Sequence, residues 1–198
     1  GRIALLSLGC AKNLADSERL VGDLAAAGFA LADSLEEADL ALVNTESRFP
    51  VPKVVEALRR KGFGTLCFYG PPGTGKTALA EHIAAELQRP LMIRQASDLV
   101  SKYVGETEQN MAKMFEEAET EQAVLLLDEA DSFLRSRRLA ERNYEVSEVN
   151  EMLQGMERFA GIFVCTTNLM DRIDQAALRR FTFKIRFKPL AAAQREKM

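Results

Sequence analysis

Between an apolar run and a helical pattern lies the segment Gly70-Pro71-Pro72-Gly73-Thr74-Gly75-Lys76-Thr77. It fits the pattern G-x-x-x-x-G-K-[ST], in which glycines allow a tight turn and successive backbone N–H groups face one anion. The helical pattern continues through Ala78, so the positive end of that helix adds to the same site. We predict that residues 70–78 bind the phosphates of a nucleotide.

Two side chains of this loop have chemistry of their own. Lys76 should reach the β and γ phosphates of ATP as a point charge, and the Thr77 hydroxyl should ligate Mg²⁺. The alternative is a chance glycine-rich turn, which the strand before the loop and the helix after it disfavour. The predicted cofactors are therefore ATP and Mg²⁺.

An acidic pair ends another apolar strand. Residues 124–127 are apolar, and Asp128 and Glu129 follow them directly. Asp128 would hold the metal shell, and Glu129 would orient and activate the attacking water. The alternative is a plain strand followed by an acidic helix start. The spacing of the pair after the phosphate loop favours the functional interpretation.

The order of elements predicts an α/β fold with a doubly wound parallel sheet. Strand-like apolar runs alternate with helical patterns along the chain, as in proteins with parallel sheets. After residue 45 the expected strands cover residues 66–69, 91–94, 124–127, 162–166 and 183–187, and helices are expected at 53–61, 76–88 and 175–178. Ligands bind such sheets at the carboxyl ends of the strands.

The first 45 residues show a smaller pattern of the βαβ kind. Strands are expected at residues 3–8, 29–32 and 38–43, and an amphipathic helix at 13–27. From Thr45 to Pro52 polar residues and prolines break regular structure, and we place the boundary between two domains, 1–45 and 46–198, there. A unit this small is usually stable only with disulfides, a bound metal or a packing partner, so we expect it to pack against the larger part.

Composition narrows the class of protein. The chain has 198 residues, a net charge of −3 and three cysteines, which is ordinary for a globular protein and suggests neither nucleic acid nor a membrane as partner. The odd number and wide spacing of the cysteines favour reduced, buried thiols and a cytoplasmic location. His82 is the only histidine, which argues against a histidine-based metal site or a Ser-His-Asp triad.

Four motifs in this order resemble AAA+ ATPases of the protein-remodelling branch: residues 70–77, Asp128-Glu129-Ala130-Asp131, Thr166-Thr167-Asn168 and Leu178-Arg179-Arg180-Phe181. The resemblance covers about residue 46 to the end, and it implies ATP binding and hydrolysis. It also implies that Asn168 is a sensor residue beside the γ-phosphate. Arg179 and Arg180 would be arginine-finger positions that act on a neighbouring subunit. A solvated helix end is the alternative for these two arginines.

The same resemblance implies a polypeptide partner and a ring of subunits. Residues 101–106 resemble a pore loop, in which Tyr103 and Val104 would grip a translocating chain; a plain turn is the alternative. The chain ends at Met198, before the helical lid of the family, and Thr182 stands where the family carries an aspartate. We therefore expect a mainly monomeric protein that binds nucleotide and hydrolyses it slowly. The alternative function is a scaffold that binds nucleotide with little or no turnover.

Residues 1–45 resemble the N-terminal domain of radical-SAM methylthiotransferases, on the strength of residues 7–18 and 38–45. In that family the cysteine that matches Cys10 helps to hold an iron–sulfur cluster, but Glu46 stands where the family pattern continues with cysteine. One thiolate cannot hold a cubane cluster, so we interpret Cys10 as a vestigial thiol and the segment as a scaffold. The meeting of two families near Thr45 suggests a recombined or designed chimera.

Overall fold

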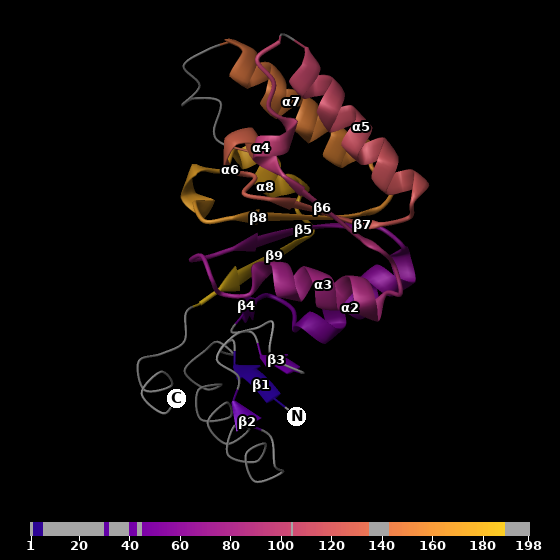
Figure 1. The fold of residues 1–198 in the computed structure, drawn as a ribbon, viewed down its shortest axis with the longest axis vertical. Helices are drawn as coiled ribbons and strands as arrows, with labels where there is room; N and C mark the ends of the chain where they lie inside the picture. Colours follow the sequence, from indigo (N-terminus) through magenta and orange to yellow (C-terminus); the bar gives the residue numbers. More distant parts are fainter. Residues whose placement is uncertain are drawn as a thin grey trace.

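The computed structural model describes residues 2–5, 30–31, 40–42, 45–103, 105–134 and 143–188. Within these residues a six-stranded sheet lies between two layers of helices, and the N-terminal strands form a three-stranded sheet of their own (Figure 1). The predicted α/β fold with a doubly wound parallel sheet is confirmed, with the difference that one edge strand is antiparallel.

The six-stranded sheet has the strand order β4-β9-β5-β8-β7-β6. All neighbouring pairs are parallel except β4 with β9. Strands buried on both faces read as continuous apolar runs, and every residue of β8 is buried. The strands are β4 (Thr45–Ser47), β5 (Gly64–Tyr69), β6 (Leu91–Gln95), β7 (Val124–Asp128), β8 (Ile162–Thr167) and β9 (Phe183–Phe187).

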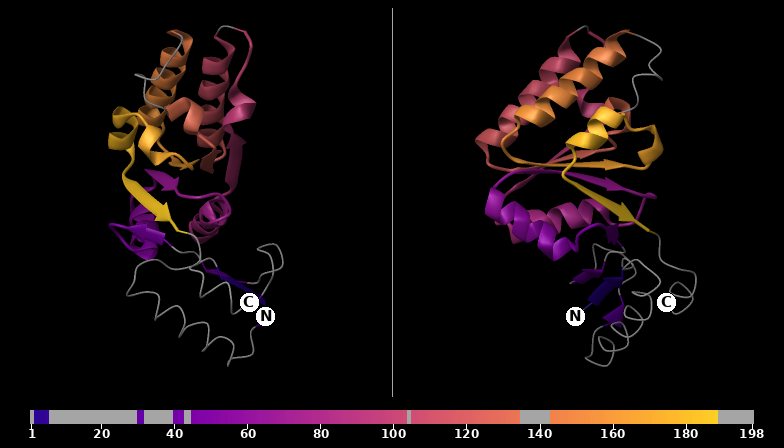
Figure 2. Two further views of the ribbon diagram at one scale, coloured as in Figure 1. Left: turned by 90° about the vertical axis from the view of Figure 1, so that its left-hand side faces the viewer. Right: turned by 180° about the vertical axis from the view of Figure 1, so that it is seen from behind.

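Helices cover both faces of this sheet, and Figures 1 and 2 show the two layers. One layer holds α2 (Val51–Lys61) and α3 (Lys76–Glu86). The other holds α4 (Ala96–Leu99), α5 (Glu106–Thr120), α6 (Asp131–Leu134), α7 (Asn143–Arg158) and α8 (Gln175–Arg180), with a 3₁₀ turn, η2 (Met170–Arg172), before α8.

The core consists of two apolar clusters, one on each face of the sheet. Side chains of β7 alternate between them, because successive residues of a strand point to opposite faces. Val124 and Leu126 belong to the cluster under α2 and α3, whereas Leu125 and Leu127 belong to the cluster under α5 and α7. The apolar run that predicted a strand therefore fills both cores at once.

Strand register brings three chain segments to one edge of the sheet. Tyr69 at the end of β5 is opposite Thr167 at the end of β8, and Leu127 of β7 is opposite Cys165. The residues that follow these strands therefore emerge side by side at the carboxyl edge. This is the edge at which α/β sheets of this kind bind ligands.

Two cysteines lie in the middle of the sheet. Cys67 of β5 and Cys165 of β8 are directly opposite each other, and both are buried free thiols. Burial and the neighbouring thiol raise the pKa of Cys165 well above its ordinary value. Both side chains behave as small apolar residues of the core.

The N-terminal sheet has the order β2-β1-β3 and is parallel. Its strands are β1 (Arg2–Leu5), β2 (Ala30–Leu31) and β3 (Leu40–Leu42). Parallel neighbours need a crossover connection between them, which agrees with the predicted βαβ pattern. The helix predicted at 13–27 and Cys10 lie outside the described residues, and the packing of this unit on the larger part stays a prediction.

The predicted irregular stretch from Thr45 to Pro52 is wrong at both ends. Residues 45–47 form β4, which pairs antiparallel with β9 and places Glu46 opposite Arg186. Helix α2 begins at Val51, and Pro52 fits its first turn because backbone N–H groups there have no partner within the helix. The pairing of β4 depends on a strand far along the chain, so the local pattern could not show it.

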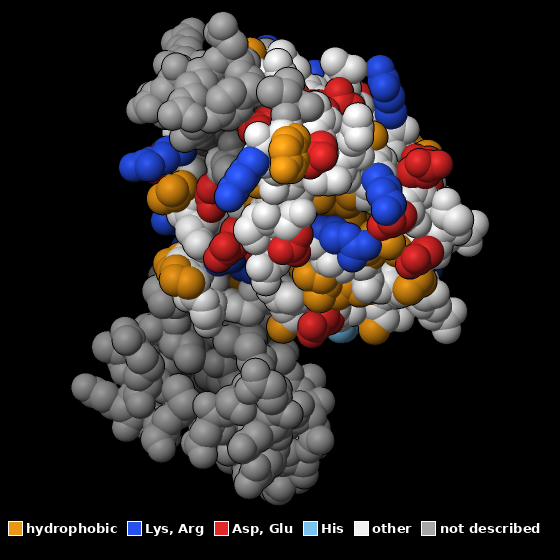
Figure 3. Space-filling model, turned by 45° about the horizontal axis from the view of Figure 1, so that its top comes forward, with side chains coloured by type: hydrophobic (Ala, Val, Ile, Leu, Met, Phe, Trp, Pro, Cys, Tyr) orange, Lys and Arg blue, Asp and Glu red, His pale blue; other side chains and the backbone are white. Residues whose placement is uncertain are grey.

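The described residues contain no helix that is long and apolar enough to cross a membrane. On the face shown in Figure 3, basic and acidic side chains are interspersed over the described part of the molecule.

Candidate nucleotide-binding site

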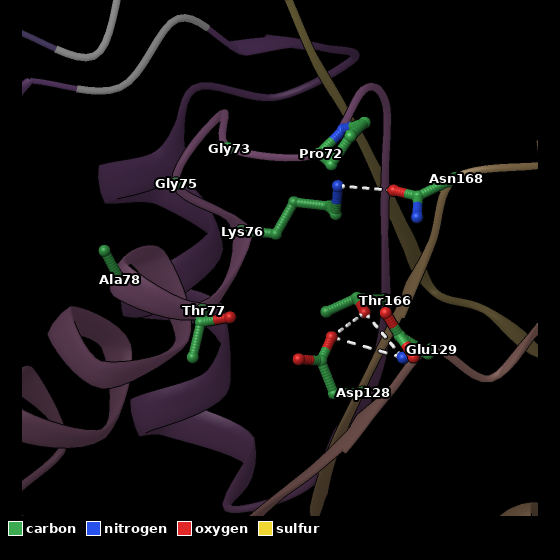
Figure 4. A pocket seen from close by; sticks show the side chains of 10 residues that line it. All are labelled: Pro72, Gly73, Gly75, Lys76, Thr77, Ala78, Asp128, Glu129, Thr166 and Asn168. Carbon is green, nitrogen blue, oxygen red and sulfur yellow. Dashed lines mark hydrogen bonds between the residues drawn. The ribbon is translucent and has the colours of Figure 1, made fainter. Parts of the chain in front are cut away.

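A pocket of about 250 Å³ opens at the carboxyl edge of the sheet (Figure 4). The predicted phosphate loop, the acidic pair and Asn168, which are far apart in the sequence, all contribute to it. Its lining consists of Pro72, Gly73, Gly75, Lys76, Thr77, Ala78, Asp128, Glu129, Thr166 and Asn168.

The loop leaves β5 in a conformation that requires glycine at Gly70. The φ angle of Gly70 is 145°, and a Cβ atom there would stand 2.2 Å from the carbonyl oxygen of Phe187. Gly73 and Gly75 also have positive φ angles, of 70° and 85°. These values turn the backbone tightly around the pocket, as the motif predicts.

Lys76 is the first residue of α3, and it is buried. Its Nζ donates hydrogen bonds of 2.8 Å to the carbonyl oxygens of Gly70 and Pro71 and to Oδ1 of Asn168. The hydroxyl of Thr74 also donates to the Pro71 carbonyl, at 2.8 Å. Gly70, Pro71 and Thr74 are not among the lining residues of the pocket; their hydrogen bonds shape the loop and orient the lysine, and their contact with phosphate stays a prediction.

The charge pattern of the pocket is one cation facing several acids. Burial lowers the pKa of Lys76, and the nearby carboxylates of Asp128, Asp131 and Glu129 oppose that shift. A lysine at a helix N-terminus attracts phosphate, while carboxylates attract a divalent cation. Together they fit a polyphosphate that enters with its metal ion.

The acidic pair is tied to the neighbouring strand. Asp128 is the last residue of β7, and its Oδ1 accepts a hydrogen bond from the hydroxyl of Thr166 in β8. The backbone N–H of Glu129 donates to Oγ1 of Thr166 at 3.1 Å and to Oδ1 of Asp128 at 3.2 Å. Figure 4 shows the three residues together at one side of the pocket.

A second threonine holds the loop that carries Asn168. The hydroxyl of Thr167 donates to Oδ1 of Asp131 and accepts from the backbone N–H of Leu169 at 2.9 Å. Asn168 therefore lies between two anchored residues. The motif Thr166-Thr167-Asn168 predicts a role for Asn168 alone, because a threonine in an apolar run is also typical of a strand; two adjacent hydroxyls at the end of such a run are the signal that the sequence offers for the threonines.

The pocket fits Mg²⁺ in its donor chemistry. The Asp128 carboxylate and the Thr77 hydroxyl both line it, and Mg²⁺ takes a few protein oxygens while phosphates and waters complete its shell. No group of three or more His, Cys, Asp or Glu side chains that could hold a metal ion exists among the described residues. A metal here would depend on the nucleotide for its other ligands.

The two predicted arginines lie on α8, away from the lining of the pocket. The helix expected to end at Leu178 continues through Arg180, so both arginines belong to its last turn. Arg180 pairs with Oε1 of Glu157 on α7 at 2.7 Å, and its Nη1 donates to the Ala176 carbonyl at 2.9 Å. Arg179 is exposed and forms no ion pair with the described residues.

Tyr103 lies in the loop between α4 and α5, with 72% of its surface exposed. Its backbone N–H donates to Oγ of Ser101 at 3.2 Å, and that hydroxyl bonds to the carboxylate of Glu106. Val104 lies outside the described residues. The exposed ring is available to a partner, and its predicted role in gripping a polypeptide stays a prediction.

A parallel sheet with a glycine loop, a buried lysine and an acidic pair at its carboxyl edge defines a P-loop nucleotide-binding domain. A family model described as ATPase family associated with various cellular activities (AAA) matches residues 66–189, which is more than half of the chain. The chain belongs to this family, and its larger part is an ATP-binding core of the AAA type.

Curated relatives share this part of the chain. An uncharacterized protein, ORF529 of Acidianus two-tailed virus, is 33% identical over 159 residues, or 71% of this chain and 30% of that protein. An uncharacterized AAA family ATPase, y4kL of Sinorhizobium fredii, is 40% identical over 119 residues, or 59% and 36%. Spastin of Sus scrofa is 36% identical over 141 residues, or 68% and 23%. The chain thus spans between 23% and 36% of these relatives.

A second family model matches the beginning of the chain. It is described as Uncharacterized protein family UPF0004 and covers residues 2–47. This match coincides with the segment that resembles methylthiotransferases and supports that resemblance. Two different family models therefore follow each other along one chain.

Proposed function

We propose that residues 46–198 form a domain that binds ATP together with Mg²⁺ and hydrolyses it. The observation that carries this proposal is the convergence of Lys76, the acidic pair and Asn168 on one pocket, with Lys76 bonded to Asn168 at 2.8 Å. A phosphate-binding loop and a potential water-activating acid from different chain segments thus face the same space.

The proposed roles follow from the atoms that each residue presents. Lys76 and the loop N–H groups bind the phosphates, and the Asn168 amide, whose oxygen accepts from Lys76, presents its nitrogen as a donor to the γ-phosphate. Glu129 orients the attacking water and accepts its proton. Magnesium, when bound, neutralises phosphate charge, and Thr77 and Asp128 are the residues that would hold it.

We assign different roles to Arg179 and Arg180. Arg179 is exposed and unpaired among the described residues, as a side chain that acts on a neighbouring subunit must be before assembly. Arg180 is engaged with Glu157 inside its own chain, so we assign it to holding α8 against α7. Whether the protein is mainly monomeric, as predicted, is decided by its mass in solution with and without nucleotide.

The remaining assignments belong to the same proposal. We infer two domains, 1–45 and 46–198, joined as a recombined or designed chimera in which the first serves as a scaffold. Tyr103 and Val104 are proposed to contact a polypeptide substrate. The buried thiols Cys67 and Cys165 favour a reducing, cytoplasmic location.

The test combines binding and turnover. Calorimetric titration with ADP and with a non-hydrolysable ATP analogue, each with and without Mg²⁺, measures affinity, and steady-state phosphate release measures turnover. Binding with measurable release supports the full proposal, and binding without release supports the scaffold alternative. A ligand that binds only the folded state raises its stability, by about 2.7 kcal/mol at a hundredfold excess over Kd; no thermal shift with saturating nucleotide would refute both.

A further inference from the structure

Thr166 combines a polar side chain with a fully buried position. It is 1% exposed, and it belongs to β8, in which every residue is buried. A buried hydroxyl needs hydrogen-bond partners within the protein, because burial removes its hydrogen bonds to water and this costs free energy. Thr166 also lines the pocket, so the partners that it uses are those of the site.

Both partners of the hydroxyl belong to the acidic pair. Oγ1 donates its proton to Oδ1 of Asp128 and accepts the backbone N–H of Glu129 at 3.1 Å. A threonine hydroxyl has one proton to donate and lone pairs that accept, so the same atom serves both acids at once. It orients the side chain of the first acid and the main chain of the second.

These hydrogen bonds stabilise a turn in which the backbone conformation of Glu129 is unfavourable. Its φ angle is 55°, in the left-handed region that residues with a Cβ atom seldom adopt. The Thr166 carbonyl also accepts the N–H of Ala130 at 3.0 Å. The turn after β7 is therefore fastened to Thr166 by its hydroxyl and by its main chain.

We propose that Thr166 is a positioning residue for the hydrolysis proposed above, on which this inference rests. Its hydroxyl sets the direction of the Asp128 carboxylate toward the metal position. It also stabilises the turn that presents Glu129 to the pocket. Removal of this one hydroxyl would loosen both acids while the phosphate loop stays as it is.

The variant pair Thr166→Val and Thr166→Ser separates the hydroxyl from the shape of the side chain. Valine keeps the branched shape and removes the hydroxyl, whereas serine keeps the hydroxyl and removes the methyl. Thr107→Val is the matched control, because Thr107 is 2% exposed and its hydroxyl accepts the Ser101 N–H at 3.0 Å, outside the pocket lining. It reports what the loss of a buried threonine hydroxyl does to the fold alone.

The measurements are kcat, the Kd of ADP without metal, and the gain in ADP affinity on adding Mg²⁺. Loss of a residue that orients a metal ligand typically costs about 10–100-fold in activity or metal affinity. We expect Thr166→Val to lose kcat and the magnesium-dependent gain to that extent, with the metal-free Kd within about twofold of the parent. Thr166→Ser and Thr107→Val should keep both.

Two results would overturn the proposal. One is a Thr166→Val variant with the kcat and magnesium dependence of the parent; the other is an equal loss in the valine and serine variants, which would indicate a packing role only. If the parent binds nucleotide without turnover, the hydrolysis proposal fails, and the magnesium-dependent gain in ADP affinity still decides the role of Thr166.

Discussion

Gly70→Ala is the substitution whose effect on the stability of the fold follows most directly from the structure. The added Cβ would stand 2.2 Å from the carbonyl oxygen of Phe187, 3.0 Å from its carbonyl carbon and 3.1 Å from its Cβ. Phe187 is fully buried at the end of β9, and two of these atoms belong to its backbone. The clash therefore cannot be relieved by rotating a side chain, so the phosphate loop or β9 must move.

The magnitude follows from two contributions. An overpacked interior site costs about 1–3 kcal/mol, and a side chain at a φ angle of 145° adds backbone strain of about 1–3 kcal/mol. Gly73→Ala is the control, since Gly73 also has a positive φ angle, 70°, but its Cβ would meet nothing within 4 Å. The control should cost only about 1–2 kcal/mol.

The assay compares Tm and the urea midpoint of the two variants and the parent without nucleotide. A further loss of about 2 kcal/mol in Gly70→Ala corresponds to a Tm about 4–8 °C below that of Gly73→Ala for a protein of this size. Equal transitions for the two variants would contradict this prediction, because they would show that the close approach of Gly70 to Phe187 does not lower stability in Gly70→Ala.

Four further predictions concern the pocket, the contact between α8 and α7, and the edge strand β4. Lys76→Ala should weaken ADP binding about 10–100-fold, measured by calorimetry, because it removes a charged donor. Glu129→Gln should keep ADP affinity and lower the rate of phosphate release about 10²–10⁴-fold. Weak ADP binding by Glu129→Gln would contradict the role assigned to Glu129. A double-mutant cycle of Arg180→Ala and Glu157→Ala in thermal unfolding should give a coupling below about 1 kcal/mol, since the pair is partly exposed; a larger value would mean that α8 depends on this contact. Lys188, whose Nζ forms an ion pair with Oε2 of Glu46 at 2.7 Å, and then Arg186 lower the pKa of Glu46. The stabilising effect of Glu46 is therefore present at neutral pH and is lost as the pH falls through the lowered pKa. Glu46→Gln should have a slightly lower Tm than the parent at pH 7 and the same Tm once the pH is below that pKa, and a difference that persists in acid would exclude this ion pair as its cause.

The larger domain was predictable in its order of elements because its signals are local. Apolar runs such as residues 124–127 fill two cores at once, and a strand of that kind needs no distant partner to be recognised. The ends of helices and strands depend on contacts between elements. Helix α8 runs on through Arg180, which pairs with Glu157 on α7, and a local pattern does not show a contact between two helices.

The same distinction applies to the pocket. Gly70, Gly73, Lys76 and Thr77 stand in one short segment, so the spacing that makes a phosphate loop is visible in the residues themselves. The hydrogen bonds between Thr166 and the acidic pair, in contrast, join residues of two different strands. They exist only because β8 lies beside β7 in register, and neither strand shows this pairing by itself.

The class of fold, the phosphate loop and the acidic pair follow from the amino-acid sequence alone, because periodicity and motif spacing act over a few residues. Three contacts are visible only in the folded protein: β4 pairs with β9, Asn168 bonds to Lys76, and Thr166 holds the turn at Glu129. Each of these contacts joins residues far apart in the chain. Such contacts form when strands of matching register are packed together, and the free energy of that packing belongs to the whole sheet rather than to any one segment.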